Sequence, residues 1–349
     1  MKKIIIVFIL IINASLLFSQ SENNLMQSID DNNIEEVKNI IRDGYNLDVF
    51  DSKYNMTPLM YAAKNGNIDI VRELLDFGAK DIDMAFYVSC MEGYWDIAKE
   101  LNNAGASNYN IAVSYAAFGG KLDIVKELIN MGAKDINSAL VSACEGGDID
   151  TINYLIEMGA NVNAENFLFV YRNYEGAIRK SPLSASKDLD ITKRLIEAGA
   201  TNLNDALIYN AKNNNTNMVF NLIELGADVN SYETNNGKSV LMYSIERENA
   251  NLDNIKKLIE LGADVQARDR NGNSVLIRSV MYQYEKKVEE YNKTIYKTFG
   301  TDINIIEELL KAGANPTDRN NYDNTAYRLA ARKKRKDIIE LFDSYVEKK

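Results

Sequence analysis

The chain contains no histidine. This absence excludes the ordinary serine or cysteine catalytic triad, an imidazole general base and the common zinc sites, because each of them uses a histidine side chain. We therefore expect that the protein is not an enzyme and that it holds neither a cofactor nor a metal.

Positively charged residues are outnumbered by negatively charged ones. The chain has 40 lysines and arginines against 50 aspartates and glutamates, a net charge of −10. The average field of such a chain repels phosphate, so we expect no nucleic acid partner. A basic run from Arg332 to Lys336 is expected to keep the end of the chain soluble, and the alternative is a site for an acidic partner.

A long hydrophobic run is missing as well. The apolar stretch from Ile4 to Leu17 is short for a membrane span; two lysines precede it and Ser19 follows it. This pattern predicts a cleaved secretory signal peptide at residues 1–19, and hence an exported protein, periplasmic or secreted, without membrane insertion after cleavage. Because Ser19 with Leu17 is a poor cleavage site, a membrane tether by an uncleaved signal anchor is the alternative.

The chain does have a recurring Gly-Ala pair, with Gly44-Tyr45 as a degenerate first copy. The glycines of the pair are Gly78, Gly105, Gly132, Gly159, Gly199, Gly226, Gly262 and Gly313. Self-similarity of this kind indicates a solenoid, in which each repeat closes its core only against its neighbours.

An amphipathic helix is predicted before each Gly-Ala pair. Four residues before the glycine stands a leucine or isoleucine, such as Leu74, and eight before it often an isoleucine, such as Ile70. The glycine then lies just past the helix, in a left-handed turn. Nine residues before it an acidic residue recurs in the first helical turn. Asp150 occupies that position, which explains it and its neighbour Asp148 better than a catalytic carboxylate pair does.

A shorter helix precedes the amphipathic one in each repeat. Its best copy, Thr57 to Ala63, reads Thr-Pro-Leu-Met-Tyr-Ala-Ala and resembles the ankyrin repeat family, whose helix pairs carry Thr-Pro-Leu-His-x-Ala-Ala. The resemblance implies an all-α repeat solenoid of stacked ankyrin-like helix-turn-helix units, with short β-hairpin fingers in some repeats. We assign residues 20–349 to one solenoid of about ten repeats, with insertions near 163–182 and 281–303.

The chain departs from the family pattern in its spacing. Several glycines are 27 residues apart, against about 33 for the family. The shortfall lies between the Gly-Ala turn and the first helix, so these repeats are expected to lack the finger. Fingers should then cluster towards the two ends of the chain. In the short repeats four residues are expected to cap the first helix directly: Asp83, Asn110, Asn137 and Asn204.

The two cysteines, Cys90 and Cys144, occupy the same place in repeats that are two apart. Helix layers about 10 Å apart would put them about 20 Å from each other, whereas a disulfide needs Cα atoms within about 7 Å. We expect both to be small core residues.

Two insertions interrupt the repeats. The first carries Phe167, Phe169, Tyr171 and Tyr174, and its alternating aromatic residues favour an enlarged finger. These aromatic side chains either pack on the neighbouring repeat or form a rigid recognition patch. The second insertion is expected to extend two helices into a solvated paddle, or to form a binding lobe.

The resemblance implies protein binding through finger tips and through the ends of the first helices. The matching positions are Tyr54, Asn55, Lys64, Asn65, Met91, Glu92, Phe118, Glu145, Lys212 and Asn213. We therefore expect a monomeric, non-enzymatic protein-protein interaction scaffold that binds one or more proteins in the periplasm or outside the cell. The alternatives are an accessory factor that shields or escorts an envelope enzyme, and a secreted host-directed effector.

Overall fold

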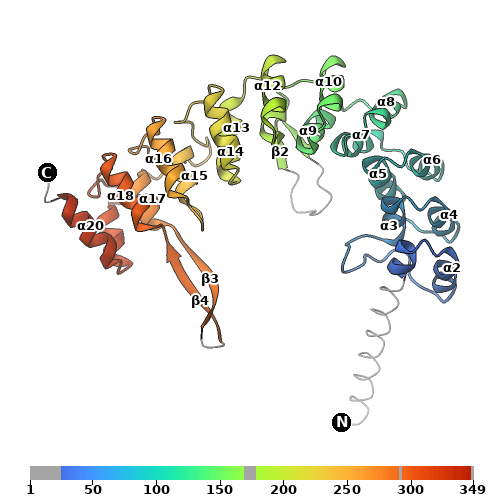
Figure 1. Cartoon of the computed structure of the whole chain (residues 1–349), viewed down its shortest axis with the longest axis horizontal. Coiled ribbons are helices and arrows are strands. Elements are labelled where there is room, and N and C mark those ends of the chain that lie inside the picture. Colours follow the sequence, from blue (N-terminus) through green and yellow to red (C-terminus); the bar gives the residue numbers. More distant parts are fainter. Residues whose placement is uncertain (1–24, 169–177, 291–292, 347–349) are drawn as a thin grey trace, which may run out of the picture. The chain divides into compact units, whose positions relative to one another are not determined.

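The structure is a computed structural model that describes residues 25–168, 178–290 and 293–346 (Figure 1). For residues 166–168, 178–179, 287–290 and 293–298 it describes the backbone alone. The predicted signal peptide at residues 1–19 lies outside the described residues. The chain divides into two compact units, Met1–Gly199 and Ala200–Lys349.

The N-terminal unit is a stack of helix pairs. Residues 25–30 are helical and precede the first labelled helix. The elements that follow are α2 (Ile34–Arg42), α3 (Pro58–Asn65), α4 (Ile68–Asp76), α5 (Ile82–Glu92), α6 (Trp95–Asn103), α7 (Tyr109–Phe118), α8 (Leu122–Asn130), α9 (Ile136–Gly146), α10 (Ile149–Glu157), β1 (Asn166–Leu168), β2 (Ile178–Lys180), α11 (Pro182–Ala185) and α12 (Leu189–Glu197). The first helices α3, α5, α7, α9 and α11 pack against one another in that order.

The C-terminal unit repeats this arrangement. Its elements are α13 (Leu203–Lys212), α14 (Thr216–Glu224), α15 (Val240–Ile245), α16 (Leu252–Glu260), α17 (Val275–Met281), β3 (Gln283–Glu290), β4 (Lys293–Gly300), α18 (Ile303–Lys311), α19 (Ala326–Arg332) and α20 (Lys336–Val346). The first helices α13, α15, α17 and α19 again pack in succession. Each unit is therefore an all-α repeat solenoid, as the sequence predicts.

The core of both units lies between neighbouring helix pairs. The leucines that stand four residues before each Gly-Ala glycine are at most 2% exposed. The glycines have left-handed backbones: Gly105, for example, has φ +121°, and a Cβ atom added to it would meet nothing within 4 Å. The backbone conformation, not crowding, is therefore what requires glycine at this turn.

The predicted caps of the short first helices are wrong. These helices begin at Ile82, Tyr109, Ile136 and Leu203, so the residues that were expected to cap them lie inside the first turn. Residues just before the helices stand at the cap instead: the Asn108 side chain accepts a hydrogen bond from the Ile111 amide, and Asp135 accepts one from Ser138.

The four residues that were expected to act as caps bind the next repeat instead. The Asn110 Oδ1 atom accepts hydrogen bonds from the Lys134 and Asp135 amides, at 2.7 and 3.0 Å. Its counterparts accept bonds from the equivalent amides: Asp83 from Ser107 (3.3 Å), Asn137 from Asn161 (2.7 Å) and Asn204 from Asp228 (2.8 Å). We call these contacts repeat latches, because each joins a side chain of one repeat to the backbone of the next.

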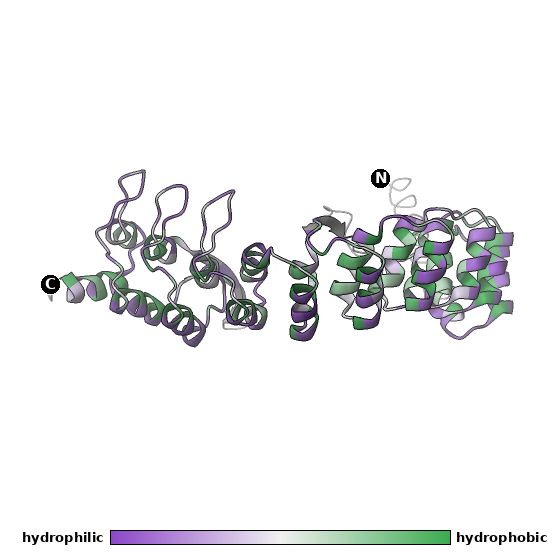
Figure 2. Cartoon of the chain, turned by 90° about the horizontal axis from the view of Figure 1, so that it is seen from above, coloured by the Kyte–Doolittle hydropathy of each residue, from purple (hydrophilic) through white to green (hydrophobic). Residues whose placement is uncertain are grey.

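The predicted distribution of fingers is confirmed. Long connections before the first helix occur at residues 46–57, 228–239, 264–274 and 315–325, whereas only residues 79–81 separate Gly78 from α5. The three fingers of the C-terminal unit stand side by side (Figure 2). Backbone bonds join them: the Arg270 amide donates to the Asn236 carbonyl (2.9 Å), and the Asn321 amide donates to the Asn271 carbonyl (3.0 Å).

The two insertions both form β-hairpins. In the first, β1 and β2 pair antiparallel with Phe167 opposite Arg179, which agrees with the predicted enlarged finger. The second was expected to extend two helices, and this is wrong: β3 and β4 pair over eight residues, with Tyr284 opposite Phe299. The helix α17 ends at Met281, and the Tyr284 and Phe299 rings stack with centroids 5.6 Å apart. Cross-strand aromatic pairing of this kind stabilises a hairpin rather than a helix.

Two glycines bring the ends of the first helices close together. A Cβ atom on Gly119 would lie 1.9 Å from the Met91 carbonyl oxygen, and one on Gly146 would lie 2.1 Å from the Phe118 carbonyl oxygen. Gly119 has an ordinary φ of −76°. Glycine is thus required here for close approach of α5, α7 and α9, and not for the turn.

We expect Gly119→Ala to lower the free energy of unfolding by about 1–3 kcal/mol, because the added methyl group forces α5 and α7 apart. Replacing glycine by alanine at an ordinary φ normally raises the free energy of unfolding. A decrease for Gly119→Ala would therefore point to the steric clash between the helices. Urea denaturation followed by circular dichroism measures it. Gly147→Ala is the control: its φ is +90° with open space around the Cβ atom, so it reports the backbone cost alone. Unchanged stability of Gly119→Ala would contradict a role of this glycine in helix spacing.

Candidate protein-binding surface

The ends of neighbouring first helices in the N-terminal unit approach each other closely. Met91 lies in the last turn of α5 and Phe118 is the last residue of α7, and Gly119 holds these two ends in contact. Tyr94, in the turn after α5, lies over Gly66, where a Cβ atom would be 2.7 Å from its ring. We call Met91, Tyr94 and Phe118 the helix-end patch.

The helix-end patch is apolar and accessible. Phe118 is 42% exposed and Tyr94 is 41% exposed, while Met91 is half-buried. The same two helices, α5 and α7, carry two buried tyrosines, Tyr87 and Tyr115, whose ring centroids are 5.5 Å apart. Burial raises the pKa of Tyr87 to about 12, with Asp83 and Tyr115 adding to the effect. Methionine and aromatic side chains on a rigid, uncharged base are typical of the centre of a protein interface.

Two of these three residues follow from the sequence. Met91 and Phe118 were predicted from their place at the helix ends, and both lie in the patch. Tyr94 was missed because it follows the turn glycine instead of ending the helix. The sequence does distinguish Tyr94, because it is an aromatic residue at a position where the sister repeats have the polar residues Asn67, Lys121 and Asp148.

The predicted positions on the N-terminal side of the patch belong to a hydrogen-bonded cluster. Asp30 accepts bonds from the Tyr61 hydroxyl (2.7 Å) and from the Asn65 amide (2.9 Å). Burial, together with Asp30, raises the pKa of Tyr61. Tyr54 packs on Tyr61 with ring centroids 4.6 Å apart. Asn65 and Tyr54 are thus held in place.

Other predicted positions beside this cluster are more accessible. Lys64 and Glu92 are partly exposed, and Asn55 is exposed in its finger. Each of them lies in the same unit as the helix-end patch, and they can supply polar contacts around it.

Glu145 was predicted to contact a partner, and the structure does not leave it free to do so. Its side chain is 12% exposed and forms ion pairs with Lys180 (2.6 Å) and Lys187 (2.5 Å). Burial alone would raise the pKa of Glu145, but hydrogen bonds from the two lysines outweigh burial and lower it. Glu145 therefore anchors the base of the first insertion to α9 instead of facing a partner.

The remaining predicted positions lie outside this surface. Lys212 and Asn213 are in the C-terminal unit, where Lys212 pairs with Glu233 at 2.9 Å and Asn213 donates to the Tyr209 carbonyl at 2.8 Å. Of the aromatic residues of the first insertion, Phe169, Tyr171 and Tyr174 lie outside the described residues, and only the backbone of Phe167 is described. Their role stays a prediction.

The residues considered for chemistry have structural roles. Asp148 caps α10 by accepting a hydrogen bond from the Thr151 amide at 2.9 Å. Cys90 and Cys144 are buried and unbridged, as predicted, and burial raises the pKa of both thiols. Within the ranges that the structure describes, no group of histidine, cysteine or carboxylate side chains is placed to hold a metal ion.

A comparison with protein families decides the identity of the fold. The family model described as ankyrin repeats (3 copies) matches residues 5–85, 25–112, 86–166, 183–269 and 207–290. The chain belongs to the ankyrin repeat family. Ankyrin repeats are in general protein-protein interaction modules and are typically non-enzymatic. A comparison with curated proteins found no match.

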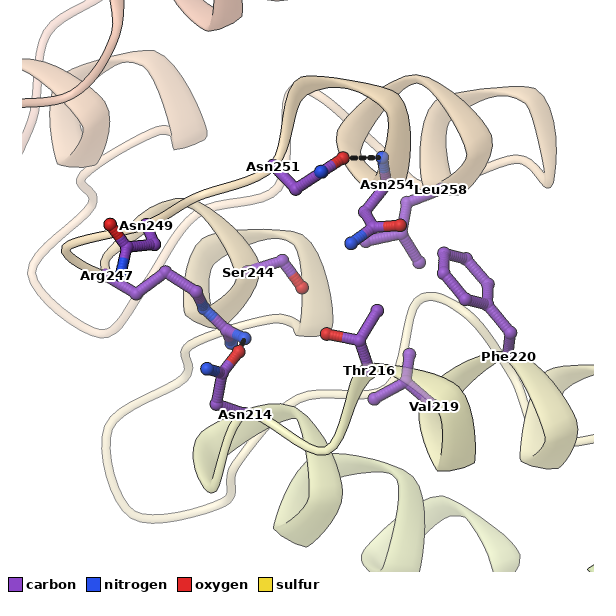
Figure 3. Close-up of a pocket in the computed structure, with 10 residues that line it drawn as sticks. All are labelled: Asn214, Thr216, Val219, Phe220, Ser244, Arg247, Asn249, Asn251, Asn254 and Leu258. Carbon is purple, nitrogen blue, oxygen red and sulfur yellow. Dashed lines mark hydrogen bonds between the residues drawn. The ribbon is translucent and has the colours of Figure 1, made fainter.

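A small cavity in the C-terminal ankyrin repeats has a structural explanation. It measures about 30 Å³, room for about one water molecule, and is lined by α14, α15 and α16 and by the turn that follows α13 (Figure 3). The Arg247 guanidinium on its wall donates to the Ala211 carbonyl (2.6 Å), the Tyr243 carbonyl (2.7 Å) and the Asn214 side chain. Arg247 thus caps two helix ends, and its donors are taken up by the protein itself.

The described part of these ankyrin repeats also contains no helix that is long and apolar enough to cross a membrane.

We expect Glu145→Gln to lower the free energy of unfolding by about 2 kcal/mol at neutral pH, because two lysines lose a charged hydrogen-bond partner. The folded-state pKa of Glu145 is lowered, so its contribution is present above the ordinary carboxyl pKa and is lost as pH falls through the folded value. The stabilities of the two proteins should therefore converge in acid. Denaturation at a series of pH values measures this, and a difference that persists at low pH would argue against an ionic contribution.

Proposed function

We propose that this ankyrin-repeat protein is a non-enzymatic scaffold that is exported and binds a partner protein in the periplasm or outside the cell. The observation that carries the proposal is the helix-end patch, in which Tyr94 and Phe118 present accessible aromatic side chains and Met91 is half-buried.

The patch suits binding because it is rigid before a partner arrives. The close helix contacts at Gly119 and Gly146 fix the spacing of Met91 and Phe118. Little backbone freedom is therefore left to lose on association, which lowers the entropic cost of binding. Tyr94 and Phe118 each offer a large contact area with only two rotatable side-chain bonds. We infer that these aromatic residues are the anchors, and that Lys64, Asn65 and Glu92 supply polar contacts around them.

We expect the double variant Tyr94→Ser and Phe118→Ser to lose a partner that the unaltered protein retains, because it removes both anchors. Affinity capture from envelope extract, with the chain from Gln20 onward as bait, measures this. The matched control is Tyr232→Ser with Tyr322→Ser. It removes two aromatic side chains from the fingers of the C-terminal unit, which at 63% and 68% exposed are more accessible than Tyr94 and Phe118. Circular dichroism must show that all baits are folded.

The pattern of loss locates the contact. Loss with the patch variant alone supports the proposal, and loss with the control alone would move recognition to the fingers. A third bait with Phe167, Phe169, Tyr171 and Tyr174 changed to serine tests the first insertion, and loss with this bait alone would place the partner there. Retention by all three baits would contradict recognition through aromatic side chains.

For export, the supporting observation is the short apolar run between two lysines and Ser19. We expect the protein in the periplasmic or extracellular fraction to begin at Gln20, as N-terminal sequencing measures. Leu10→Arg with Ile11→Arg should keep the protein in the cytoplasm, because charges interrupt the apolar run. An intact N-terminus in the membrane fraction would favour the uncleaved anchor instead.

A further inference from the structure

The basic run Arg332–Lys336 lies at the foot of the β3–β4 hairpin. It forms the turn between α19 and α20. The Lys333 ammonium donates to the Met281 carbonyl at 2.8 Å, directly before the hairpin. Arg335 lies over Gly300, the last residue of β4, where a Cβ atom would be 2.8 Å from its Nη1 atom. Lys333 and Arg335 therefore hold the basic turn beside the point where the hairpin leaves the helices.

The positive charge of this run is largely uncompensated. Arg335 pairs with Asp337 at 2.7 Å, and Arg332 donates to the Asn324 side chain at 2.8 Å. Lys334 and Lys336 are exposed, and neither has an ion-pair partner among the described residues. Burial lowers the pKa of Lys333, and the nearby Arg335 lowers it further. In a chain of net charge −10, this turn is a local region of the opposite sign.

Lys334 has a backbone conformation that a lysine rarely adopts. Its φ is +57°, in the left-handed region. The equivalent turn between first and second helix has a left-handed glycine in four earlier repeats, namely Gly66, Gly93, Gly120 and Gly147. A side chain at this position costs conformational energy that glycine avoids. Lysine at this position therefore makes the turn less stable than glycine would, and strain of this kind is an indication of function.

Apolar side chains adjoin the basic turn. Met281, whose carbonyl binds Lys333, is 39% exposed, and Phe299, next to Gly300, is 38% exposed. A surface that combines exposed apolar side chains with unpaired cations complements a segment that carries both apolar and acidic residues.

We propose that Met281, Phe299 and the basic turn Arg332–Lys336 form a docking site for an acidic, partly apolar segment of a protein. The hairpin determines the kind of partner. It extends away from the helices (Figure 1), and strands of eight residues span about 27 Å. The basic turn thus lies in the corner at its foot. A polypeptide segment can enter this corner, whereas a flat membrane surface would meet the hairpin first.

The test uses fluorescence anisotropy with the chain from Gln20 onward and a labelled peptide of about twelve residues made of glutamates and leucines. We expect binding that weakens as salt is added, and no binding of the counterpart with lysines in place of glutamates. Lys334→Gly should weaken binding about threefold, and Lys334→Gly with Lys336→Gln about tenfold. Lys334→Gly should also raise the melting temperature by about 2 °C, because it relieves the left-handed backbone.

Asn214→Gly is the matched control. Asn214 is left-handed at the equivalent turn of another repeat of the same unit, and its side chain accepts a hydrogen bond from Arg247. This change therefore removes a left-handed side chain and one internal contact far from the basic turn, and it should leave peptide affinity unaltered. Phe118→Ser should also leave it unaltered, which separates this site from the helix-end patch. Equal binding by wild type and the double lysine variant would overturn the proposal, as would equal binding of the two peptides. Binding to phosphatidylserine vesicles that the lysine changes weaken, without peptide binding, would assign the turn to a membrane surface instead.

Discussion

The structure depends on burial between neighbouring repeats. A single helix pair cannot enclose its own apolar stripe, so the leucines before each Gly-Ala turn become buried only when the next pair stacks on them. The repeat latches act at the same junctions, where Asn110 and its counterparts satisfy amides of the following repeat. Without these contacts neither the helices nor the surfaces that they carry would persist.

Burial between the repeats uses the side chains along the helix bodies and leaves side chains at the helix ends accessible. Along the helix bodies almost every apolar position is used by the stack, whereas at the helix ends the side chains face outward. The structure nevertheless controls their spacing, because Gly119 and Gly146 let the helix ends meet. The residues of the helix-end patch are thus placed by core packing although they contribute little to it. Glu145 is the exception, because its two lysine partners bind it to the protein itself.

The sequence predicted the features that recur in many repeats and missed the features that depend on a single contact. The helix pairs, the buried cysteines and the distribution of fingers follow from a register that recurs many times. The roles of Asn110 and Glu145 do not, because a partner 24 or 35 residues away cannot be inferred from a local pattern. The β3–β4 hairpin was missed because a mixture of lysine, glutamate and tyrosine is also compatible with a solvated helix. The sequence marked Lys334 only as part of the basic run Arg332–Lys336, and its left-handed conformation had to come from the structure.

The repeat latches bear on how such a chain can change its length. Each latch ends on a backbone amide, a group that every residue except proline provides. The asparagine therefore does not need a particular side chain in the repeat that follows. A repeat could be duplicated, deleted or exchanged, and the new junction would still find its hydrogen bond. Evolution could then alter the number of repeats without first matching side chains across each boundary.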